Sequence, residues 1–164
     1  MFFPAAKIIL RHPSDRTKIL LIKRTIHGIV YFEPAGGRVE VNFERKIAET
    51  LEECAIREAK EELGLTVTVD RYIGSYYFFW TIDPNKCSSC AVFIGTVIDP
   101  NIDNLDVYID QIKTEGFITN TDTNELHFEP IWITLDDVLS QKVRINDTHV
   151  GLKEIILNCF NNPL

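Results

Sequence analysis

The stretch that decides the fold runs from Gly36 to Leu65 and reads GGRVEVNFERKIAETLEECAIREAKEELGL. Its second half, from about Glu49 to Leu63, carries apolar residues at helical spacing, and Gly64 follows as a helix stop. At roughly 100° per residue, one face of this helix is apolar. The residues on that face are Leu51, Cys54, Ala55, Ala59 and Leu63.

Three glutamates break the pattern of this amphipathic helix. Glu58 and Glu62 project inside the apolar arc, and Glu61 lies on its edge. Acidic residues at core positions are patterning errors unless they serve a function. Because the three stand at i, i+3 and i+4, their carboxylates converge on one patch and repel each other unless a cation joins them. Clustered carboxylates suit Mg²⁺ or Mn²⁺, whereas a solvated Glu/Lys helix is the alternative interpretation.

Length and composition limit the classes of protein. A chain of 164 residues predicts a single domain spanning 1–164 with one sizeable core. The net charge of −7 argues against a basic patch for nucleic acid or membrane. We find neither a spanning apolar run nor a signal peptide at the start of the chain, so we expect a cytoplasmic protein with no membrane partner.

Short apolar runs predict strands on both sides of the helix. Residues 5–11 and 18–24 flank the turn signal HPSD and predict a hairpin, and residues 29–33 predict a third strand. Residues 66–80 and 91–98 are rich in β-branched and aromatic residues and predict a long hairpin. A mixed β-sheet covered by helices is the expected architecture.

The last third of the chain is less regular. Leu105, Val107 and Ile109 alternate, which predicts a small extra strand or hairpin in a polar segment. Residues 131–135 predict another strand. Two helices are expected near the end, at 136–141 and at 148–160, the second capped by Asp147 or Thr148.

The four cysteines do not predict a disulfide framework in a chain of this size. Cys87 and Cys90 form one CxxC motif, which we place in the loop between the long strands. A structural zinc site needs four ligands, usually with a second pair at similar spacing. None follows, so plain loop thiols are favoured over zinc binding or redox chemistry, both of which stay open.

The sequence around the helix resembles the signature of Nudix hydrolases. Glu49, followed after seven residues by REAKEELGL (57–65), is similar to G-x5-E-x7-R-E-U-x-E-E-x-G-U, in which U is bulky and aliphatic. Ala59 replaces one such aliphatic residue. Eleven residues rather than five separate Gly37 from Glu49, which indicates an insertion of six, VNFERK (41–46), in the loop ahead of the helix. The resemblance implies an α/β/α sandwich with a mixed β-sheet and a central catalytic helix.

The resemblance also implies roles for residues of this stretch. Glu58, Glu61 and Glu62 would bind metal together with the Gly37 carbonyl, and Glu58 is also a candidate general base. Arg57 would orient the glutamates, although a surface pair with Glu61 is the alternative. Glu49 would be a secondary ligand or an orienting residue.

Other candidate site residues lie outside the signature. Family members often recruit a further carboxylate from a late loop, and Glu125 and Glu129 are the candidates, followed by Glu115; a surface role is the alternative for each. Arg24 and Arg38 are candidate phosphate-binding residues or plain surface charges. The aromatic run YYFFW (76–80) offers base stacking, but at least half of it must pack as core.

The resemblance implies a Mg²⁺-dependent pyrophosphohydrolase, with Mn²⁺ able to substitute. Its substrate would be a small nucleoside diphosphate linked to a moiety X, giving a nucleoside monophosphate and phosphorylated X. Nucleoside triphosphates, ADP-ribose, nucleotide sugars and dinucleoside polyphosphates stay open. No nucleic-acid partner is expected, although capped RNA stays open, and a homodimer is typical of the family. A nucleotide-binding or sensor domain without turnover is the main alternative, and an isopentenyl diphosphate isomerase is a weaker one.

Overall fold

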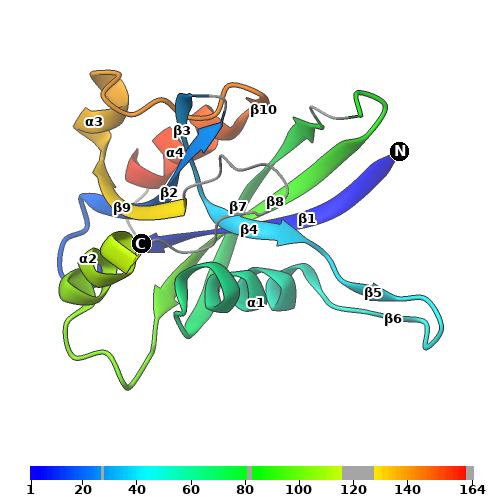
Figure 1. The fold of residues 1–164 in the computed structure, drawn as a ribbon, viewed down its shortest axis with the longest axis horizontal. Helices are drawn as coiled ribbons and strands as arrows, with labels where there is room; N and C mark the ends of the chain where they lie inside the picture. The colour runs from blue at the N-terminus through cyan, green and yellow to red at the C-terminus, as the bar shows by residue number, and fades with distance from the viewer. Residues whose placement is uncertain (27, 81–82, 116–127, 162–164) are drawn as a thin grey trace.

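The computed structural model describes residues 1–26, 28–80, 83–115 and 128–161. Figure 1 shows a twisted mixed sheet with helices on both faces and a thin hairpin that extends from the body of the protein. Along the chain, the elements are β1 (Phe2–Arg11), β2 (Lys18–Ile26), β3 (Ile29–Glu33), β4 (Ala35–Arg38), β5 (Val41–Asn42), β6 (Ile47–Ala48), α1 (Leu51–Leu63), β7 (Val67–Phe79), β8 (Cys87–Val97), α2 (Leu105–Glu115), β9 (Phe128–Thr134), α3 (Leu135–Leu139), β10 (His149–Val150) and α4 (Leu152–Asn161).

Strand β1 is the centre of the sheet. The order is β10-β7-β8-β1-β2-β3, with β4 also paired to β1 and β9 to β2. Only the β1–β8 pairing is parallel among the described strands. β2 pairs with the end of β1 at Leu10 and Arg11, whereas β4 pairs with its first half, where Lys7 is opposite Gly36. Two strands therefore share one edge of β1. β2 pairs with one part of this edge, and β4 with its glycines pairs with the part that β2 does not cover.

Each face of β1 carries its own core. Ala6, Ile8 and Leu10 pack with α1 and α2, and Ala5 and Ile9 pack with α3 and α4. This division follows from the alternation of side chains along a strand. The layers confirm the predicted α/β/α sandwich with α1 against the sheet (Figure 1). None of the described helices is long and apolar enough to cross a lipid bilayer.

Local sequence defines both ends of α1. The Thr50 hydroxyl accepts a hydrogen bond from the Glu53 amide at 3.1 Å, and the Glu53 carboxylate accepts one from the Thr50 amide at 2.7 Å. This reciprocal capping box satisfies two amides that the helix itself leaves free. At the other end Gly64 takes φ 68°, and its amide donates to the last turn. The left-handed conformation favours glycine there.

The prediction of a strand at 105–109 was wrong, because this segment forms α2. Ile109 and Ile112 are buried, whereas the Val107 side chain is 52% exposed. Leu105, Ile109 and Ile112 are thus spaced by four and three residues, which is the helical period, and Val107 lies outside this pattern. A three-residue alternation is too short to separate the two periods.

Two predictions about the later elements also need correction. Cys87 and Cys90 lie in β8 rather than in a loop, and both are buried free thiols. The helix expected from residue 148 begins at Leu152, because His149 and Val150 first pair with β7 as β10. Asp147 and Thr148 therefore do not cap it. The other strands predicted between residues 5 and 98, and the one at 131–135, are confirmed with shifted ends.

The predicted insertion forms a small hairpin rather than an open loop. Val41 pairs with Ala48 and Asn42 with Ile47, and residues 43–46 make the turn. The Asn42 side chain accepts a hydrogen bond from the Arg45 amide at 3.0 Å, which is an Asx-type turn. The hairpin closes at its base through backbone and side-chain hydrogen bonds between Glu40 and Glu49.

Replacing Thr50 with Ala tests the start of α1. The substitution removes the hydroxyl acceptor of the capping box, so we expect the free energy of unfolding to fall by about 1 kcal/mol. Urea denaturation followed by circular dichroism measures this change. Thr50→Ser keeps the acceptor and serves as the control. Equal stability of the alanine variant and the wild type would show that the cap contributes nothing.

Candidate active site

The glycines of β4 bring α1 unusually close to the sheet. The Gly36 amide donates a hydrogen bond to the Glu62 carboxylate at 2.8 Å. At Gly37, a Cβ would lie 2.2 Å from Glu58 Oε1, so any side chain there would displace this carboxylate. Gly37 has no left-handed φ. Glycine is required at this position because of the close approach, and Glu58 and Glu62, the two glutamates that project inside the apolar arc of the helix, are the ones that contact the glycine strand.

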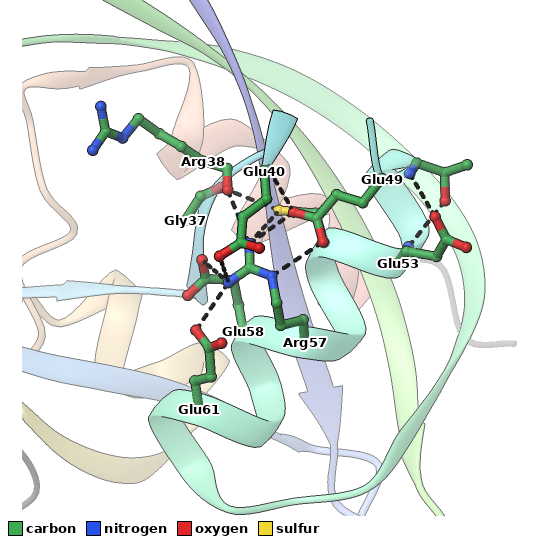
Figure 2. A network of polar contacts seen from close by, with 10 residues as sticks. Gly37, Arg38, Glu40, Glu49, Glu53, Arg57, Glu58 and Glu61 are labelled. Carbon is green, nitrogen blue, oxygen red and sulfur yellow. Dashed lines mark hydrogen bonds and ion pairs between the residues drawn. The ribbon is translucent and has the colours of Figure 1, made fainter. Parts of the chain in front are cut away.

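Arg57 connects the acidic residues around this point (Figure 2). Its guanidinium donates two hydrogen bonds to Glu49, at 3.0 and 2.7 Å. Its Nη1 atom lies 2.9 Å from both Glu58 and Glu61. Its Nη2 atom also donates to the Arg38 carbonyl at 3.0 Å. One cation therefore orients three carboxylates and holds the end of β4, as a planar guanidinium with five donors can do.

The carboxylates at this site differ in their electrostatics. Burial raises the pKa of Glu62 to about 7, against the opposing effect of the Lys7 ammonium. Burial also raises the pKa of Glu58, which Arg57 partly offsets. The hydrogen bonds from Arg57 lower the pKa of Glu49. Glu58 and Glu62 are thus desolvated anions that a nearby cation would stabilise, whereas Glu49 already has its cation.

The carboxylate oxygens of this site are the kind of ligand that Mg²⁺ prefers. Among the described residues, no three Asp, Glu, His or Cys side chains converge closely enough to form a complete metal site. Glu58 and Glu61 contact the same nitrogen of Arg57, and Glu62 lies one turn beyond Glu58. Oxygen ligands of this kind suit a hard divalent cation that keeps several waters. The Gly37 carbonyl accepts a hydrogen bond from Cys54 Sγ at 3.5 Å. Glu49, bound twice by Arg57, fits orientation better than metal binding.

A pocket of about 360 Å³ adjoins the glycine strand. Lys7 and Arg24 line it together with Arg38, and Trp80 and Phe78 supply aromatic surface. The Arg38 guanidinium lies 5.0 Å from the centre of the Trp80 ring, and the Trp80 indole donates to Ser88 at 3.0 Å. The structure thus brings the two predicted phosphate-binding arginines, Arg24 and Arg38, to one pocket with an aromatic wall.

A buried ionic cluster next to this pocket was missed by the sequence analysis. Glu33 is 2% exposed and pairs with Arg24 and with Lys7, whose ammonium is 3.7 Å away. Asn146 donates to Glu33 at 3.1 Å, and His149 Nε2 lies 3.6 Å from it. These residues come from four separate segments of the chain, so no local sequence pattern predicts the cluster. Lys7 also donates to the Gly36 carbonyl at 2.7 Å, which links the cluster to the glycine strand.

Glu33 and His149 both have lowered pKa values, for different physical reasons. The neighbouring cations hold the pKa of Glu33 at about 2 despite the strong opposing effect of burial. Burial lowers the pKa of His149 to about 4, so the imidazole is neutral at pH 7. Its ring stacks on Tyr76 at a centroid distance of 5.0 Å. The cluster is therefore a buried ionic core in which Lys7 and Arg24 both pair with Glu33, while His149 Nδ1 is buried without a hydrogen-bond partner among the described residues.

The remaining predicted residues lie elsewhere. Glu129 forms a cross-strand ion pair with Lys23 at 3.3 Å and, in the described residues, is outside the Arg57 network. Glu125 and the side chain of Glu115 lie outside what the structure describes. Within the aromatic run, Tyr76 is buried in the core, Tyr77 and Phe79 are about half exposed, and Phe78 and Trp80 line the pocket. The run is thus divided between core, surface and pocket, as alternation requires.

Comparison with known proteins identifies the family. The NUDIX domain model matches residues 1–151, and the chain belongs to this family. Nudix hydrolase 1 of Caenorhabditis elegans is 44% identical over 70 residues, a match that covers 41% of this chain and 17% of that relative. A NUDIX hydrolase structure from Nitrosomonas europaea is similar with a TM-score of 0.64 at 14% identity, covering 98% of this chain and 89% of the other. An ADP-ribose pyrophosphatase from Streptococcus suis has a TM-score of 0.57 at 14% identity, with 97% and 90% covered.

Replacing Gly37 with Ala tests the close approach of α1 to β4. The new Cβ would overlap Glu58 Oε1, so the carboxylate must rotate away. Because the overlapping atoms are the end of a flexible side chain, we expect the melting temperature to change little. We expect Mg²⁺ affinity, measured by isothermal titration calorimetry, to weaken at least tenfold, the lower range of metal-site perturbations. Unchanged affinity would show that the position of Glu58 is not critical.

His149→Gln tests the buried ionic cluster through pH. The folded pKa of His149 is about 4 and the usual value is 6.5, so the unfolded chain binds the extra proton between these values. Its contribution to stability is therefore present above pH 6.5 and is lost as the pH falls toward 4. From pH 7 to 5 we expect the wild type to lose about 2 kcal/mol more unfolding free energy than the variant. Urea denaturation at each pH checks this, and parallel curves would contradict it.

Proposed function

We propose that this protein is a Mg²⁺-dependent pyrophosphohydrolase that cleaves a nucleoside diphosphate linked to a moiety X. Water attacks one phosphorus, the bridging P–O bond breaks, and the products are a nucleoside monophosphate and phosphorylated X. The observation that carries the proposal is the arrangement of Glu58, Glu61 and Glu62 on one face of α1, held against the glycine strand beside a cationic pocket.

Mg²⁺ would be held by Glu58, Glu61 and Glu62, with the Gly37 carbonyl as a further candidate. When bound, it supplies charge neutralisation at the diphosphate and makes water more acidic. Arg57 keeps two of the carboxylates oriented, so little reorganisation is needed during the reaction. Glu58 is the candidate base for the attacking water, because burial raises its pKa toward the range in which a carboxylate accepts a proton well.

The cationic pocket would bind the nucleotide. Lys7, Arg24 and Arg38 line it and offer donors for phosphate oxygens, and Trp80 offers an aromatic surface on which a base could stack. These features support a small nucleotide as substrate. One solved structure with the same fold is named an ADP-ribose pyrophosphatase, which makes ADP-ribose one compound to test. The cytoplasmic location, the use of Mn²⁺ and the homodimer stay predictions.

The proposal is tested with Glu61→Gln and a matched control. The Glu61 side chain is 54% exposed, so its replacement should not disturb the fold. With a panel of nucleoside triphosphates, ADP-ribose and nucleotide sugars, we expect Mg²⁺-dependent release of nucleoside monophosphate by the wild type. We expect Glu61→Gln to lower kcat by at least a hundredfold, as loss of a group that stabilises transition-state charge does.

Glu52→Gln provides the control. Glu52 is an exposed glutamate in the first turn of the same helix, and its substitution removes the same charge. It should retain wild-type turnover. Full activity of Glu61→Gln would overturn the assigned role of this residue. Absence of release from every compound, with nucleotide binding retained, would favour a binding domain without turnover.

A further inference from the structure

The β5–β6 hairpin presents apolar side chains to solvent. Figure 1 shows it as an arm that extends away from the sheet. Phe43, at the start of its turn, is 87% exposed, and Val41 is 43% exposed. An exposed phenylalanine on a projecting hairpin contributes nothing to the core that the sheet and helices form. Clustered apolar surface of this kind commonly marks a binding site.

The hairpin is fixed relative to the catalytic helix. The Glu49 amide donates to the Glu40 carbonyl at 3.2 Å, and the Glu40 amide donates to the Glu49 carboxylate at 2.8 Å. The same carboxylate receives two hydrogen bonds from Arg57 (Figure 2). The base of the hairpin is thus bonded to the residue that orients Glu58 and Glu61. The arm has a defined direction with respect to these glutamates.

A groove of about 700 Å³ runs between this hairpin and the start of β1. Phe2, Phe3, Val41 and Phe43 are among its lining residues. Arg57, Glu58 and Glu61 line the same groove. One continuous groove therefore joins an apolar surface to the carboxylates proposed to act on the diphosphate.

The groove and the cationic pocket share a wall. Arg38 lines both of them. Phe3, which lines the groove, also stacks on Trp80 of the pocket with ring centroids 5.0 Å apart. A diphosphate near Arg38 thus has a pocket with three cations and an aromatic ring on one side and an apolar groove on the other. The two sides are chemically different, which suits a substrate with two different ends.

We propose that the groove binds the moiety X, and that X is an apolar group, aliphatic or aromatic, esterified to the second phosphate. This inference rests on the proposed hydrolase function. We identify the occupant from the continuity of the groove. The apolar residues line the same groove as Glu58 and Glu61, so a group that contacts them would be attached to a phosphate bound at these glutamates. The lining carries three glutamates against two arginines and the Met1 ammonium, so it has no excess of positive charge, and Arg57 is already engaged by carboxylates; an anionic end group is therefore not favoured.

The test uses two nucleoside diphosphate esters that differ only in X. The cyclohexylmethyl group and the glucosyl group each contain one six-membered ring and leave the ester with the same charge, and only the glucosyl group carries hydroxyl groups. Both are prepared with adenosine and with uridine. We expect kcat/KM of the wild type to be at least tenfold higher for the cyclohexylmethyl ester, the lower range for apolar contacts in a specificity pocket. Phe43→Ser should lower this ratio about tenfold, mainly through KM.

Val107→Ser is the matched control. Val107 is an apolar residue on α2 that is 52% exposed and does not line the groove. It should leave the ratio of the two esters unchanged, and circular dichroism should show that both variants are folded. An unchanged ratio in Phe43→Ser, with both esters still cleaved, would overturn the inference and leave the hydrolase function intact.

Two further outcomes separate the inference from the proposed function. If the wild type cleaves neither ester, the hydrolase proposal fails for these substrates, and calorimetry with the methylene-bridged analogues decides about the groove. Tighter binding of the apolar analogue that is lost in Phe43→Ser supports the groove, and equal binding overturns it. Conversion of a dimer to a monomer by Phe43→Ser, with the ratio unchanged, would show that a second copy covers the hairpin and would overturn the inference.

Discussion

The guanidinium of Arg57 is the interaction on which the site depends. It touches Glu49 from the end of the hairpin, Glu58 and Glu61 from its own helix, and the backbone of Arg38 from β4. Three segments that the chain could arrange independently are thereby fixed to one planar group. Its carboxylate neighbours raise the pKa of Arg57 itself, which keeps this cation charged under all ordinary conditions. The hydrogen bonds from Arg57 therefore persist as long as its carboxylate partners stay ionised.

Glu58 and Glu62, the two partly buried glutamates, have fewer stabilising partners than Arg57 has. Glu62 has an amide from Gly36 and the more distant charge of Lys7, and burial still dominates its pKa. Glu58 shares Arg57 with two other carboxylates. Such groups cost folding free energy unless a further cation arrives. A protein that keeps them beside its glycine strand is locally less stable where it would bind metal, which is a common compromise at functional sites.

Prediction from the sequence succeeded where one local pattern decides the structure. The Gly64-terminated helix, the strands predicted between residues 5 and 98 and the family follow from spacing within a short window, whereas the Thr50–Glu53 capping box and β4–β6 were not predicted. The segment around Leu105 was assigned wrongly, because Leu105 and Ile109 fit both the strand and the helix period, and the apolar Val107 between them favoured the strand although its side chain is exposed. Cys87 and Cys90 were placed in a loop, because polar neighbours hid the pairing of this segment with β1 and β7.

The buried cluster around Glu33 could not be predicted in the same way. Its members lie up to 116 residues from Glu33 along the chain, and each alone resembles an ordinary surface charge. Only the division of the sheet along β1 brings Lys7 beside the glycine strand. The candidate site therefore has two parts. Its acidic part is encoded in one helix and can be read from the sequence, whereas its cationic part is a product of topology.

The closure of the β5–β6 hairpin by Glu40 and Glu49 also explains how the signature tolerates an altered spacing. These two residues are joined across the base, so the eight residues between them form a loop whose ends do not move when its length changes. Lengthening such a loop adds little entropic cost, because the cost grows only with the logarithm of its length. The interval between Gly37 and Glu49 is then a place where the chain can acquire new surface next to the candidate site.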